Sequence, residues 1–116
     1  MSFSLINFSE STNGKPVQVA GATSGTETTI HTSDATKMDE ITIYATNTDA
    51  TAVALTLALG STVNEAELIL DAVDIEPNNS PTPILIKQPL TGSVTVKAFA
   101  GTVNKINLFG TITRIG

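Results

Sequence analysis

The chain has 116 residues, of which 41% are hydrophobic and 4% aromatic, and its formal charge is −5. This length fits one domain with one core, which Val, Ile, Leu and Ala must mostly supply. The six basic residues are scattered, which disfavours nucleic-acid binding because phosphate backbones are bound by dense Lys and Arg. The chain has no cysteine for disulfides or thiolate metal sites, and no apolar run approaches the roughly 20 residues of a membrane-spanning helix.

The N-terminal segment, residues 1–24, has strand candidates at residues 4–8 and 17–20, with a loop rich in Ser, Gly and Asn around them. It begins without the basic and apolar regions of a signal peptide, so we expect synthesis in a cytoplasm. Two hypotheses remain open: an arm that becomes ordered on binding, or the first strand of the fold followed by a flexible loop. In the first hypothesis the candidate contact residues are Phe3, Leu5, Ile6 and Phe8.

Residues 25–116 are predicted to form a β-sandwich domain. Strands are expected at residues 27–32, 41–46 and 52–59, because Ile41, Ile43 and Ala45 alternate with polar residues and β-branched side chains favour strands. The turn residues 47–50 predict that the second and third of these strands form a hairpin.

Four further strands are predicted at residues 68–75, 84–86, 93–100 and 105–115, with a proline-rich turn at residues 77–81. Gly110 indicates a bulge or a close backbone approach. The fold expected from these elements is all-β: a single compact β-sandwich or jelly-roll-like domain. We expect six large side chains in its core: Ile43, Leu55, Leu57, Val96, Phe99 and Phe109.

His31, Ser33 and Asp34 invite comparison with a catalytic triad, but no nucleophile-elbow motif accompanies them. The densest acidic stretch lacks the spacing of an EF-hand, although cation binding there stays open; it comprises Glu65, Glu67, Asp71, Asp74 and Glu76. The loop of residues 21–25 lacks the lysine of a phosphate loop, and Asn78-Asn79-Ser80 matches a glycosylation acceptor. We therefore predict a non-enzymatic protein with no catalytic, cofactor-binding or metal-binding residues.

Four segments resemble strands of small structural proteins of tailed bacteriophages. They occur in the same order: a TTIHT strand at residues 28–32, a DEI-x-x-YA-x-N strand at 39–47, a V-x-AFA strand at 96–100 and a terminal N-x-x-N-x-FG-x-x-x-RI strand at 104–115. The resemblance covers most of residues 25–116. It implies a virion component of the capsid decoration or cement type.

As implied by this resemblance, the chain would be made in the host cytoplasm and located on the capsid surface. Its partner would be the major capsid protein, and it would act as a homo-oligomer, a dimer or a trimer, without nucleic-acid or membrane partners. The alternative is a β-sandwich of a head fibre or tail that binds carbohydrate or a host surface. A third hypothesis, a small hydrolase using His31 or the acidic stretch, ranks below both.

Overall fold

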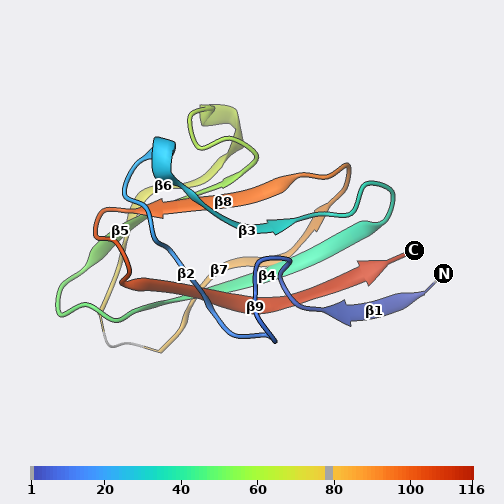
Figure 1. Cartoon of the computed structure of the whole chain (residues 1–116), viewed down its shortest axis with the longest axis horizontal. Helices are drawn as coiled ribbons and strands as arrows, with labels where there is room; N and C mark the ends of the chain where they lie inside the picture. The colour runs from blue at the N-terminus through green and yellow to red at the C-terminus, as the bar shows by residue number, and fades with distance from the viewer. Residues whose placement is uncertain (1, 78–79) are drawn as a thin grey trace.

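Two antiparallel sheets make up most of the chain in the computed structural model, which describes residues 2–77 and 80–116 (Figure 1). The first sheet has the order β1 (Phe3–Ile6), β9 (Ile106–Ile115), β4 (Met38–Asn47) and β7 (Thr82–Leu90), with β2 (Val17–Gln18) also paired to β9. The second has the order β3 (Thr28–Thr32), β8 (Thr95–Ala100), β5 (Val53–Leu59) and β6 (Leu68–Ile75). Two single-turn 3-10 helices, η1 (Ser24–Thr26) and η2 (Glu65–Glu67), complete the described elements. Within the described residues, no helix has the length and apolar character needed to cross a membrane.

The connections between strands make this sandwich jelly-roll-like. From β2 onward, every connection except that between β5 and β6 passes from one sheet to the other. Strands that follow one another in sequence therefore usually lie in opposite sheets, as in double-sheet jelly rolls. The all-β sandwich predicted from the alternation is confirmed.

The predicted hairpin between residues 41–46 and 52–59 is wrong. Strand β4 pairs with β9 and β7, whereas β5 pairs with β8 and β6. The Asn47 side chain explains the crossing, because its amide nitrogen donates to the carbonyls of Thr51 (2.9 Å) and Ile75 (2.8 Å). Its Oδ1 accepts from the Asp49 N–H at 2.8 Å, which directs the chain towards the other sheet.

The core lies between the sheets and is almost entirely aliphatic. Ile43, Leu55, Leu57 and Val96 are fully buried, as expected. Phe99 and Phe109 are not in the core and are only half-buried, so this part of the prediction is wrong. The alternation along β8 and β9 places their smaller neighbours inward and the two rings outward; these neighbours are Val96, Ala98, Ala100, Ile106 and Leu108.

Part of the N-terminal segment is built into the sandwich. Strand β1 pairs with β9 in an unbroken register from Phe3 opposite Ile115 to Ile6 opposite Ile112. Phe8 is buried in the core. The next two residues cover the edge of β3: the Glu10 N–H donates to the Ile30 carbonyl (3.3 Å) and the Thr32 N–H donates to Ser9 Oγ (2.8 Å). Both termini consequently lie at one end of the molecule (Figure 1).

Candidate functional site

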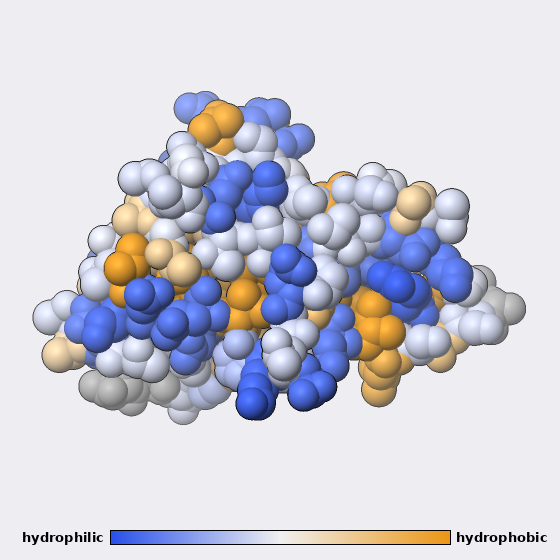
Figure 2. All heavy atoms as spheres, in the orientation of Figure 1, coloured by the Kyte–Doolittle hydropathy of each residue, from blue (hydrophilic) through white to orange (hydrophobic). Residues whose placement is uncertain are grey.

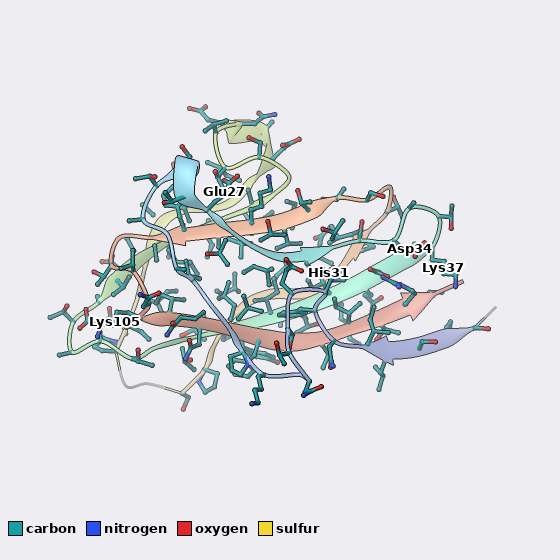
Figure 3. All side chains as sticks on the ribbon, in the orientation of Figure 1. Glu27, His31, Asp34, Lys37 and Lys105 are labelled. Atoms are coloured by element: carbon teal, nitrogen blue, oxygen red, sulfur yellow. The ribbon has the colours of Figure 1, made fainter. Side chains whose placement is uncertain are left out.

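One buried polar cluster links the two sheets. Asp39 on β4 is 0% exposed and follows the inward alternation of Ile41 and Ile43. Arg114 lies opposite it on β9, and His31, which is 1% exposed, reaches it from β3 in the other sheet. Figure 3 shows His31 between the two layers, with Asp34 in the loop that joins β3 to β4.

The Asp39 carboxylate is held by donors from three parts of the chain. Arg114 binds it with two nitrogens, Nε donating to Oδ1 at 2.7 Å and an Nη to Oδ2 at 2.9 Å. His31 Nε2 lies 2.8 Å from Oδ2, and the Asp34 N–H also donates to Oδ2 at 3.3 Å. A two-nitrogen arginine contact of this kind is stronger and more directional than a single neutral hydrogen bond.

The hydrogen bonds of His31 indicate which nitrogen carries the proton. Nδ1 accepts from the Ser9 N–H at 2.9 Å, so it is unprotonated. Nε2 therefore carries the proton and donates it to Asp39, which fits a neutral ring. Both ring nitrogens are thus occupied, and the imidazole joins the N-terminal segment, β3 and β4.

Arg114 largely sets the charge state of this cluster. Its hydrogen bonds, followed by that of His31, lower the pKa of Asp39 from 3.8 to about 2, although burial opposes the shift. The same contact with Asp39 raises the pKa of Arg114. The pKa of Asp34 is lowered chiefly because its carboxylate accepts from the N–H groups of Thr36 and Lys37.

The structure does not assemble a triad from His31, Ser33 and Asp34. Ser33 Oγ accepts from the Val94 N–H at 2.8 Å, and the Asp34 carboxylate accepts from the Thr36 N–H in the turn that follows it. Sequence reasoning missed the two residues that actually accompany His31, namely Asp39 and Arg114. The alternation of the two strands could have indicated them, because each is a charged residue at an inward position, two residues from the core residues Ile41 and Ile112 respectively.

The acidic stretch is spread over η2, the edge strand β6 and the residue after it. Asp71, Asp74 and Glu76 are exposed, while Glu67 Oε1 accepts from the Ser61 N–H at 2.7 Å. Across residues 2–77 and 80–116, no three histidine or acidic side chains converge to hold a metal ion. In the loop of residues 21–25, the 3-10 turn η1 is closed by the Thr26 N–H donating to the Thr23 carbonyl at 3.0 Å. Asn78 and Asn79 of the glycosylation match lie outside the described residues.

The four candidate contact residues separate into two pairs. Phe3 and Leu5, on β1, are 70% and 81% exposed. Ile6 packs partly against the core, and Phe8 is buried within it. In the space-filling view, apolar surface projects at the end of the molecule where β1 lies, at the lower right (Figure 2).

A second surface feature is an aromatic pair in the middle of the five-stranded sheet. Tyr44 on β4 lies opposite Phe109 on β9, and their rings stack with centroids 5.9 Å apart and planes inclined by 27°. Both are half-buried and lie on the outward alternation of their strands. The next outward positions, Thr46 and Asn107, are polar.

These features belong to a β-sandwich in which, across the described residues, buried side-chain nitrogen and oxygen atoms all have hydrogen-bond partners. At its surface lie the exposed side chains of β1 and the Tyr44–Phe109 pair. The chain was compared with known protein families, with curated proteins and with solved structures, and none of them matched.

Proposed function

We propose that this chain is a non-enzymatic bacteriophage capsid decoration protein that attaches to the outside of the shell of major capsid proteins and stabilises it. The resemblance of four strands to small phage virion proteins supports this function. The jelly-roll-like architecture is also used by viral capsid proteins and lectins, although fold alone is an argument by analogy.

The observation that carries the proposal is the exposed apolar end of the five-stranded sheet. Phe3, Ile115 and Met38 lie opposite one another in a row across β1, β9 and β4. Leu5 follows in the next row, opposite Thr113. We call Phe3, Leu5, Met38 and Ile115 the apolar end. Exposed apolar groups that gather in this way mark interaction surfaces more often than single scattered ones do.

The proposed mechanism is mass action on an assembled shell. A protein that binds the shell but not its free subunits stabilises the shell in proportion to the logarithm of its concentration over the dissociation constant. Repetition over many equivalent sites multiplies the effect. Since the chain carries a charge of −5, a neutral or basic capsid surface would favour the encounter.

The test is co-sedimentation of the protein with capsids of the phage that encodes it. The double variant Phe3→Ser, Leu5→Ser should bind at least about tenfold more weakly, because burying each side chain contributes about 1.5–3 kcal/mol. Val63→Ser is the matched control, since Val63 is 75% exposed but lies in the turn before η2, on the connection between β5 and β6 of the other sheet. Equal binding of the double variant and the control would refute the apolar end as the contact surface.

Glycan binding by a head fibre or tail module is the second candidate, and the Tyr44–Phe109 pair favours it. Sequence reasoning ranked it lower because the core was expected to need most of the aromatic residues. In the described core only Phe8 is a phenylalanine, so the pair is available on the surface as a stacking platform. Glycan-array binding that Tyr44→Ala abolishes, together with no binding to capsids, would favour this candidate over decoration.

A further inference from the structure

The sandwich has four sheet edges, and three of them are protected against pairing with another strand. Strand β7 carries Pro83 and Pro89, which lack N–H donors, and a register shift towards Lys87, whose φ is +50°. Strand β6 has two register shifts, a positive φ of 51° at Ala72 and exposed Asp71 and Asp74. These devices are ones by which sheet proteins avoid association at their edges.

The third edge, β3, is covered by the chain itself. On its outer side, the Thr32 N–H donates to Ser9 Oγ and the Ile30 carbonyl accepts from the Glu10 N–H, so these groups already have partners within the chain. Farther along, the Ala20 N–H donates to Thr28 Oγ1 at 2.9 Å. The unprotected part of the fourth edge is β1, which has no proline, no charged residue and no register shift, and all of residues 2–5 are exposed.

The alternation of hydrogen-bonded and non-hydrogen-bonded residue pairs between β1 and β9 shows which backbone groups of β1 could bond to a further strand. The Gly116 N–H donates to the Ser2 carbonyl at 2.9 Å, so these directly opposed residues form a hydrogen-bonded pair. In an antiparallel ladder such pairs alternate, which directs the backbone of Ser4 and Ile6 to β9 as well. The N–H and C=O groups of Phe3 and Leu5 therefore point away from β9, towards the open edge.

We propose that a second copy of this chain pairs with that edge, strand β1 against strand β1, antiparallel about a two-fold axis at Ser4. In this register Phe3 of each copy lies opposite Leu5 of the other, so the outward backbone groups of the two residues bond each other. The arrangement is self-complementary, as a two-fold interface requires. It also brings together two acidic chains at a strand that carries no charge.

Edge pairing would also enlarge the apolar end. Residues directly opposite in an antiparallel pair have their side chains on the same face of the sheet. The two copies of Phe3 and Leu5 would therefore form one apolar cluster on the outer face of a sheet continuous across the dimer. The self-association does not depend on the proposed capsid binding and is measured on the isolated protein, so either proposal can fail without the other.

Sedimentation equilibrium of the purified full chain, over about 1–500 µM, tests the pairing. The wild type should dimerise reversibly. Leu5→Pro should raise the dissociation constant at least about tenfold, because the proline removes an N–H that faces the second copy and not β9. Proline is accepted on an edge strand whose N–H faces solvent, so the melting transition should persist. Leu5→Val, which retains the N–H and an apolar side chain, is the control.

A pair of double variants tests the register and does not depend on the proline. Phe3→Lys with Leu5→Lys places like charges opposite one another between the copies and should be monomeric. Phe3→Lys with Leu5→Glu places opposite charges there, and its dissociation constant should be at least about tenfold lower than that of the first variant. Both doubles remove the same apolar side chains.

Three results would overturn the inference. The first is a wild type that stays monomeric up to 500 µM. The second is dimerisation of Leu5→Pro as strong as that of Leu5→Val. The third is equal association of the two charged doubles, which would place the contact between copies away from β1.

Discussion

Asp39 lies at an inward position of β4, on the same face of the strand as the core residues Ile41 and Ile43. An unpaired carboxylate there would be destabilising by several kcal/mol, because the interior solvates charge poorly. Arg114 and His31 compensate by donating directly to it, and each comes from a different strand. The cluster therefore fixes the relative placement of β3, β4 and β9 through directional bonds that aliphatic packing lacks.

Asp39→Asn should destabilise the protein by about 3 kcal/mol at neutral pH, since it leaves Arg114 without its ionic partner. The folded carboxyl has a pKa of about 2 against 3.8, so the unfolded chain takes up its proton first as the pH falls. The ionised carboxylate thus contributes about 2 kcal/mol above about pH 5, and this contribution is lost progressively as the pH falls through 3.8 towards 2.

Urea unfolding between pH 2 and pH 7 measures this contribution. The wild type should lose stability on the acid side, and Asp39→Asn should lose less over the same range. Asp71→Asn, at an exposed position on β6, is the control and should retain the wild-type acid dependence. Identical acid dependence in the wild type and Asp39→Asn would contradict this account of the cluster.

At the scale of the element, β9 organises the five-stranded sheet. It pairs with β4 over ten consecutive residues on one side and with β1 and β2 on the other. Gly110 sits in its middle, opposite Ile43. A Cβ atom there would lie 1.9 Å from the Thr42 carbonyl oxygen, so of the two predicted roles for this glycine the close backbone approach is confirmed.

Gly110→Ala should therefore be costly, with a loss of at least about 2 kcal/mol of unfolding free energy, because backbone of β4 or β9 would have to move. Gly101→Ala is the matched control, since a Cβ there would meet Ala54 only at ordinary contact distance, 3.9 Å. Chemical denaturation of both variants measures the difference. A loss in Gly110→Ala no larger than in Gly101→Ala would show that the strands separate easily at this point.

At the scale of the whole molecule, the N-terminal segment closes the sandwich as well as extending it. Strand β1 lengthens one sheet, Phe8 fills the core, and Ser9 bonds His31 and the edge of β3 in the other sheet. One short segment thus contacts both layers and the space between them. Its removal should affect the whole fold and not one edge.

Deleting residues 1–12 should abolish the cooperative melting transition or lower its midpoint by more than about 10 °C. Loss of a buried Phe alone is destabilising by about 3–5 kcal/mol, and about 1 kcal/mol shifts the midpoint by several degrees in a domain of this size. Calorimetry of the deletion variant beside Phe3→Ser, Leu5→Ser, which should melt like the wild type, provides the measurement. A deletion variant with an unchanged transition would instead favour the hypothesis of an arm that becomes ordered on binding.

The sequence by itself determined the all-β class and the approximate position of each of the nine strands in the described residues, because alternation and turn residues are local properties. Only the tertiary structure decided that β4 and β5 lie in different sheets and do not pair, that Phe99 and Phe109 point outward, and that His31 and Arg114 both meet Asp39. Period-two alternation distinguishes the two faces of a strand but leaves open which face is buried against which sheet. The Asp39–Arg114 contact joins residues 75 positions apart, and it depends on which strands lie side by side in the sheet and not on either strand's own pattern.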